Sequence, residues 1–192
     1  MPRLRFAVLC ASNQNRSMEA HNVLKEHGFD IRSFGTGTAV RLPGPSIDKP
    51  NIYSFGTPYN DIFNELLRKD KHLYTQNGLL AMLDRNRKIK RAPERFQETQ
   101  ETFDVVFTCE ERCFDAACDT ILNRKQHCNK PAHIINIEII DNHEQAAVGG
   151  KLILQLAQKI EQSTDLDQEI DELLEDYISQ TGANVLHTVT YF

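Results

Sequence analysis

The residues between positions 6 and 17 constrain this chain most, because they place a cysteine and an arginine in one short polar loop. Residues 6–9 form a brief apolar run typical of a buried strand, and this run leads directly into Cys10. A stretch rich in helix formers begins at Ser17, immediately after Arg16. The sequence therefore predicts a loop that joins the end of a strand to the start of a helix.

Such a loop has the chemistry of a phosphate site with a nucleophile in its centre. Free N–H groups and the positive end of the helix dipole favour a bound phosphate, and they also favour a thiolate over a thiol. Arg16 adds two planar donors for two phosphate oxygens. The alternative is a buried cysteine and a solvated arginine that have no shared role. The order strand, cysteine, polar loop, arginine and helix favours the phosphate site instead, because it is the structural setting that such a site needs. The candidate phosphate-binding residues are Ala11, Ser12, Asn13, Gln14, Asn15, Arg16 and Ser17.

Strand-like and helix-like segments alternate along the rest of the chain. Gly28 suits the left-handed position beyond the end of the first helix. Apolar runs predict strands at 31–34, 103–107, 132–137 and 185–192. Helical patterns predict helices at 108–123, opening with a capping box, at 144–162 and at 166–182. We therefore expect a three-layer α/β fold, with a mostly parallel central sheet, helices on both faces and a C-terminal edge strand.

A long segment separates the second and third predicted strands. It holds about 65 residues, which is more than a crossover or a plain loop needs. The segment opens with the turn-rich stretch 41–45, for which we expect no regular structure, and continues with predicted helices at 59–71 and 77–87. We expect a helical cap at about 38–100, beside the phosphate loop and within a single domain spanning 1–192. The alternative is that these helices only extend the core.

Composition narrows the class of protein. A formal charge of −5 argues against a protein whose main function is direct binding of nucleic acid. No signal peptide opens the chain and no apolar run approaches the ~18 residues of a membrane span, so we expect a soluble, intracellular protein. The basic run 85–91 is typical of a solvated face or linker, and it also suits attraction of an acidic, phosphorylated partner.

The five cysteines fit a reducing compartment better than a disulfide scaffold, because their number is odd and their spacing irregular. Four of them and one histidine raise the alternative of a zinc site, but their spacings match no common zinc finger. We therefore predict no metal and no cofactor. The residues of that alternative are Cys109, Cys113, Cys118, Cys128 and His127.

The first motif resembles the low-molecular-weight protein tyrosine phosphatase fold. In that fold the residues matching Cys10, Arg16 and Ser17 are the nucleophile, the phosphate clamp and the hydroxyl that steadies the thiolate, and Asn13 matches the loop asparagine. A closer resemblance runs the full length of the chain, to the Ssu72 family of RNA polymerase II C-terminal-domain phosphatases. Its motifs are CASNQNRSMEAH at 10–21, SFGTGT at 33–38, RLPGP at 41–45, DKPNIY at 48–53, LDRN at 83–86, TCEER at 108–112 and DNHE at 141–144.

This resemblance implies a nuclear, metal-independent phosphatase that acts on the fifth-position and seventh-position serines of the polymerase heptad. It also implies a serine–proline bond bound in the cis form, a symplekin-type scaffold as partner, and a role in mRNA 3′-end processing and transcription termination. Asp141 is the expected general acid, at the carboxyl edge of the sheet where α/β folds place their sites. We expect Pro43, Leu79 and Met82 to wall the substrate groove.

Two features differ from the small tyrosine phosphatases. Asn15 stands where those enzymes carry a second loop cysteine, and Asp141 is followed by Asn142 rather than by proline. A small tyrosine phosphatase or arsenate reductase stays an alternative, against which this difference and the long insertion both count. A structural subunit of a 3′-end processing complex, whose chemistry is dispensable, is the alternative from another class.

Overall fold

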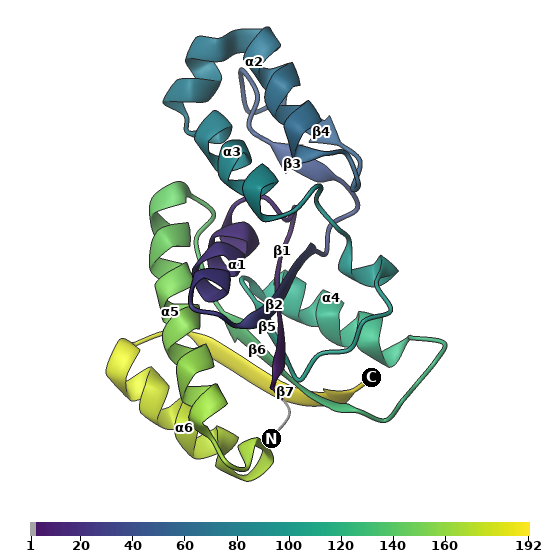
Figure 1. The fold of residues 1–192 in the computed structure, drawn as a ribbon, viewed down its shortest axis with the longest axis vertical. Helices are drawn as coiled ribbons and strands as arrows, with labels where there is room; N and C mark the ends of the chain where they lie inside the picture. Colours follow the sequence, from purple (N-terminus) through teal and green to yellow (C-terminus); the bar gives the residue numbers. More distant parts are fainter. Residues whose placement is uncertain (1–2) are drawn as a thin grey trace.

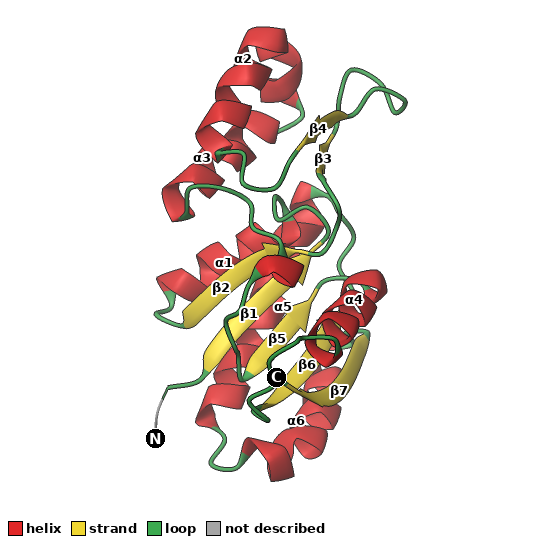
Figure 2. Cartoon of the chain, turned by 90° about the vertical axis from the view of Figure 1, so that its right-hand side faces the viewer, coloured by secondary structure: helices red, strands yellow, loops and turns green. Residues whose placement is uncertain are grey.

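A five-stranded sheet forms the centre of the protein in this computed structural model, which describes residues 3–192 (Figures 1 and 2). The strand order is β2-β1-β5-β6-β7, and all pairs are parallel except β6 with the edge strand β7. The predicted sheet and its C-terminal edge strand are therefore confirmed. The strands are β1 (Arg5–Cys10), β2 (Asp30–Gly35), β5 (Val105–Thr108), β6 (Pro131–Ile137) and β7 (Val185–Tyr191).

Helices cover both faces of the sheet because successive side chains of a strand point to opposite sides. Phe6 and Val8 pack with the first set of helices, whereas Ala7 and Leu9 pack on the other face. The first set is α1 (Arg16–Glu26), α5 (His143–Gln162) and α6 (Leu166–Thr181); the other face carries α4 (Glu111–Leu122) and the short 3-10 helix η1 (Phe96–Glu98). No helix among residues 3–192 is long and apolar enough to cross a membrane.

The part of the segment between β2 and β5 that covers residues 40–89 forms a separate layer beyond one end of the sheet (Figure 1). It has its own apolar cluster, in which Met18 of α1 also takes part. Helix α2 departs from helical geometry at Asp70 and continues to Gln76, five residues beyond the predicted end. We call this layer the cap; it consists of β3 (Val40–Leu42), β4 (Asn51–Tyr53), α2 (Tyr59–Gln76) and α3 (Leu79–Ile89).

Two local predictions are wrong. The expected capping box at 108–111 does not form, because Thr108 is the last residue of β5 and its hydroxyl donates to Asn136 Oδ1 at 2.8 Å. Glu110, in extended conformation, precedes α4 instead. The stretch 41–45 is not wholly irregular either, since Arg41 pairs with Ile52 in the antiparallel β3–β4 ladder. In both places pairing with a neighbouring strand of the same sheet outweighs a local sequence signal.

Candidate active site

The predicted loop lies between the end of β1 and the start of α1, with Cys10 almost fully buried. Its Sγ lies 3.0 Å from the Ser17 Oγ. Asn13 has a positive φ of 53°, and its amide nitrogen donates to the same hydroxyl oxygen at 2.9 Å. Because Ser17 accepts this bond, its own proton is free to point at the sulfur, and a donor in that place stabilises a thiolate.

Arg16 is buried beside the cysteine at only 4% exposure. Its Nη1 donates to the main-chain oxygen of Ile139 at 3.0 Å and to Glu110 Oε2 at 3.1 Å. Burial lowers its pKa, but the neighbouring charges of Cys10 and Asp141 outweigh burial, so the net pKa is raised. Within residues 3–192 the buried Nε has no hydrogen-bond partner. The guanidinium is therefore held in its charged form with a free donor.

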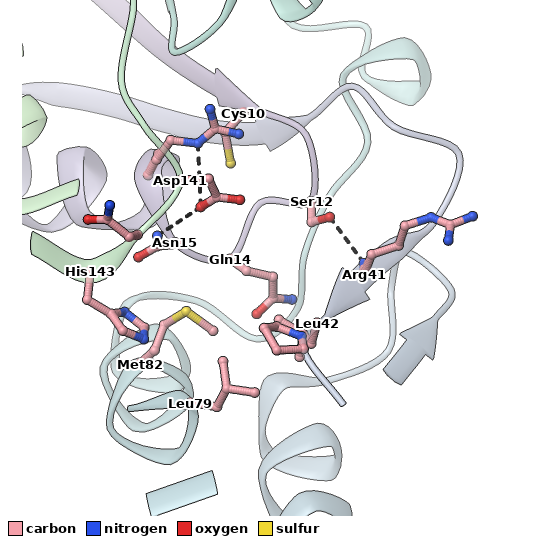
Figure 3. A pocket seen from close by; sticks show the side chains of 13 residues that line it. Cys10, Ser12, Gln14, Asn15, Arg41, Leu42, Leu79, Met82, Asp141 and His143 are labelled. Carbon is pink, nitrogen blue, oxygen red and sulfur yellow. Dashed lines mark hydrogen bonds and ion pairs between the residues drawn. The ribbon is translucent and has the colours of Figure 1, made fainter. Parts of the chain in front are cut away.

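Asp141 lies in the loop between β6 and α5, at the carboxyl edge of the sheet. Its Oδ1 accepts a hydrogen bond from Asn15 Nδ2 at 2.9 Å and lies 3.6 Å from Arg16 Nε (Figure 3). The Asp141 side chain keeps 61% of its surface exposed. A carboxyl group is thus fixed at the mouth of the phosphate loop and still open to a substrate.

One pocket brings most of the predicted residues together. It contains the three predicted catalytic residues and the three predicted groove residues, the latter from the cap (Figure 3). Ala11, Asn13 and Ser17 do not line it; Asn13 and Ser17 are fully buried and support the loop from behind. The predicted residues that line the pocket are Cys10, Ser12, Gln14, Asn15, Arg16, Pro43, Leu79, Met82 and Asp141.

Four residues that the sequence reasoning did not assign also line this pocket. They are Arg41, Leu42, Asn142 and His143. His143 opens α5, and its Nε2 lies 2.9 Å from the main-chain oxygen of Asn77, just before α3, so it joins the core to the cap. Glu110 was missed as well, although it follows a strand at the same edge as Asp141, the place where α/β sheets collect functional groups.

The basic run at 85–91 is not a solvated face at its first two residues, contrary to one interpretation of the sequence. Arg85 Nη2 and Asn86 Nδ2 each donate to the main-chain oxygen of Gln14 at 2.9 Å. Asn86 is fully buried, and Arg87 pairs with Asp84 on its own helix. The run therefore begins as part of the contact between cap and phosphate loop.

The full chain is similar to a named group of phosphatases. The family model described as Ssu72-like protein matches residues 4–192. The SSU72 phosphatases of Homo sapiens and Gallus gallus, named for the C-terminal domain of RNA polymerase II, are each 54% identical over 189 residues, covering 98% of this chain and 97% of theirs. The Schizosaccharomyces pombe phosphatase of that name is 54% identical over 194 residues, with the same coverage.

Solved structures agree with the sequence relatives. Drosophila melanogaster Ssu72 with Symplekin, bound to a cis peptidomimetic of the C-terminal domain carrying phosphoserine at position five, has a TM-score of 0.96 and 47% identity, over 99% of each chain. A second D. melanogaster structure, a serine phosphatase of this C-terminal domain, has a TM-score of 0.96 and 48% identity, over 99% of this chain and 100% of that one. The resemblance noted in the sequence is confirmed, and the chain belongs to the Ssu72-like protein family.

Proposed function

We propose that this protein is a cysteine-dependent phosphatase of the RNA polymerase II C-terminal domain, acting on the fifth-position serine of the heptad and also on the seventh. The observation that carries this proposal is the meeting of Cys10, Arg16 and Asp141 in one pocket whose opposite wall is the cap. The identity of 54% with phosphatases of this substrate, over 98% of the chain, supports the substrate class.

In the first step the Cys10 thiolate attacks phosphorus in line, and the bond from phosphorus to the serine oxygen breaks. Loop N–H groups and Arg16 stabilise the charge on the three equatorial oxygens. Asp141 gives its proton to the departing serine oxygen, since an alkoxide is a poor leaving group. The products are the free serine hydroxyl and a phosphocysteine.

The contacts of Asp141 support this role. Its Oδ1 lies 3.6 Å from Arg16 Nε and accepts a hydrogen bond from Asn15 at 2.9 Å, so the carboxyl group is held at the mouth of the phosphate loop.

In the second step water attacks phosphorus and the bond from sulfur to phosphorus breaks. Asp141, now a carboxylate, takes a proton from the water, and inorganic phosphate leaves. Cys10 returns as a thiolate beside the Ser17 hydroxyl, which lies 3.0 Å from its sulfur. Every bond change is supplied by these side chains and water, so we expect no metal or cofactor to be needed.

We assign substrate selection to the cap, which we treat as an insertion at about 38–100 in one catalytic domain. Pro43, Leu79 and Met82 give the pocket an apolar wall opposite the polar loop. A proline ring after the phosphoserine suits such a wall, and the solved Drosophila relative holds a cis peptidomimetic. We therefore propose that the serine–proline bond binds here in its cis form.

The relatives act on RNA polymerase II, which implies work with the nuclear transcription machinery. We propose a nuclear location, a symplekin-type scaffold as partner, and a role in mRNA 3′-end processing and transcription termination. The complex of the Drosophila relative with Symplekin supports the partner.

A panel of synthetic heptad peptides tests the substrate. Each peptide carries one phosphate, at serine two, five or seven or on the tyrosine, and phosphate release is measured with the wild-type protein and with Cys10→Ser. We expect release from position five, slower release from position seven, and none with Cys10→Ser. Preference for phosphotyrosine would favour the small tyrosine phosphatase instead. Complementation of a cell lacking the protein by Cys10→Ser would favour a structural subunit.

A further inference from the structure

The cap contacts the phosphate loop from behind as well as facing it across the pocket. Three consecutive main-chain oxygens of the loop accept hydrogen bonds from cap side chains. Tyr59 of α2 donates to the oxygen of Asn13 at 2.6 Å. Arg85 and Asn86 of α3 both donate to the oxygen of Gln14, and Arg85 reaches the oxygen of Asn15 at 3.4 Å.

These donors are themselves fixed. Glu19 of α1 holds Arg85 through an ion pair of 2.5 Å. Asn86 and Tyr59 are fully buried, and burial, followed by the charge of Cys10, raises the pKa of Tyr59 well above its ordinary value. The tyrosine therefore keeps its proton and remains a donor at neutral pH.

The direction of a carbonyl fixes the direction of the next N–H group. A trans peptide unit is planar, and its C=O and N–H point to opposite sides. All peptide bonds among residues 3–192 are trans. Carbonyls of residues 13–15 that are held toward the cap therefore turn the N–H groups of Gln14, Asn15 and Arg16 the other way, toward the concave side of the loop.

We propose that Arg85 and Asn86 are positioning residues of the phosphate loop. By holding the outward carbonyl of Gln14, they aim the inward N–H groups at the equatorial oxygens of the phosphate. Preorganised donors of this kind act mainly on the transition state, because they need no reorganisation as charge develops. The cap thus sets the rate of the chemical step in addition to choosing the substrate. This inference rests on the proposed phosphatase activity, though on no particular phosphoprotein.

The test compares Asn86→Leu and Arg85→Met with Arg87→Met, using p-nitrophenyl phosphate as substrate and vanadate as inhibitor. Asn86→Leu removes a donor without changing charge. Arg87→Met is a matched control: it removes the same charge as Arg85→Met from the same helix, and Arg87 instead stacks on Phe63 at 4.0 Å and bonds Asn60. Thermal unfolding of each variant reports on folding.

We expect kcat to fall, and the inhibition constant of vanadate to rise, each by about tenfold in Asn86→Leu and more in Arg85→Met. KM should change less than threefold, and Arg87→Met should stay within twofold of the wild type in all three constants. A partly unfolded preparation would lower kcat but leave the inhibition constant for vanadate unchanged. That readout therefore separates positioning from a general loss of structure.

Unchanged kcat and vanadate inhibition in folded Asn86→Leu would overturn the proposal, as would an equal loss in Arg87→Met. Should Asn86→Leu not fold, Asn86→Ser decides by the same criteria, because its shorter side chain cannot reach the Gln14 oxygen. Failure of the heptad assay would leave this result standing, since neither the aryl phosphate nor vanadate requires the heptad. Failure of the wild-type protein to hydrolyse the aryl phosphate would instead contradict the proposed phosphatase activity.

Discussion

The two sides of the pocket are built differently. On one side, residues 10–17 form a polar loop in which Cys10, Asn13 and Ser17 are buried and joined by hydrogen bonds. On the other, Leu79 and Met82 are apolar residues that belong to the core of the cap. The difference teaches that the setting of the nucleophile depends on short polar contacts within one segment. The substrate choice that we propose depends on how a separately packed layer is placed against that segment.

The strongest prediction concerns the loop side. Cys10→Ser should lower turnover of every phosphate ester by more than about 10³-fold, because the reaction loses its nucleophile. Phosphate release from p-nitrophenyl phosphate and from a phosphorylated heptad peptide measures both losses. A chelator should change neither rate in the wild-type protein. Activity that a chelator removes and that added metal restores would show a metal-dependent reaction and would contradict the role given to the loop side of the pocket.

Asp141→Asn should slow the hydrolysis of substrates with a poor leaving group more than that of substrates with a good one. We expect kcat on a phosphoserine peptide to fall by about 10²–10⁴-fold, while an activated aryl phosphate, which leaves without a proton, loses much less. Parallel kinetics on the two substrates give the ratio. Glu144→Gln, in the first turn of α5 and exposed, is a matched carboxyl control that should leave both rates near the wild-type values. Equal losses on both substrates for Asp141→Asn would reject its role as acid.

Changes in the cap wall should affect the peptide alone. Leu79→Ala and Met82→Ala should each raise KM for the phosphopeptide by about tenfold, the scale of a lost apolar contact. KM for p-nitrophenyl phosphate should stay within twofold, because that substrate does not reach the wall. Leu66→Ala is a useful control, since Leu66 packs in the same cluster but does not line the pocket. Similar losses on both substrates would show that the wall also serves the chemistry.

The smallest effect is on stability. His21 of α1 is buried, and its Nδ1 lies 2.7 Å from Ser33 Oγ. Burial, then the charges of Lys90, Lys25 and Arg32, lowers its pKa to about 3. The unfolded chain therefore binds the proton more readily, so stability falls as pH drops from about 6.5 toward 3, by at most about 1.4 kcal/mol per pH unit. Urea unfolding at several pH values between 7 and 4.5 gives the free energy of unfolding at each pH. This free energy should fall less steeply with decreasing pH in His21→Gln than in the wild type, and an equal dependence on pH in both proteins would contradict the prediction.

The sequence predicted the loop side better than the cap side. Cys10, Arg16 and their neighbours are close in the chain, so a local pattern defines their geometry. Asp141 was predicted from its place after a strand and from the family motif, and the structure places it in the same pocket as Cys10 and Arg16. Arg85, Asn86 and His143 were not assigned, because their contacts join residues more than 60 positions apart. The strand at 40–42 was missed for a different reason, since its pairing with the nearby β4 outweighs the turn-rich sequence of 41–45.

The most direct test of this mechanism is the time course of phosphate release from a heptad peptide phosphorylated at its fifth-position serine, with enzyme in excess. The loop and the cap must act together on the cis form, which makes up ~10–30% of such bonds in unfolded peptides and refills over tens to hundreds of seconds. We predict a fast burst of that size followed by a slow tail, which a prolyl isomerase shortens without changing the burst. Complete release in one fast phase, or equal cleavage of cis-locked and trans-locked analogues, would contradict it.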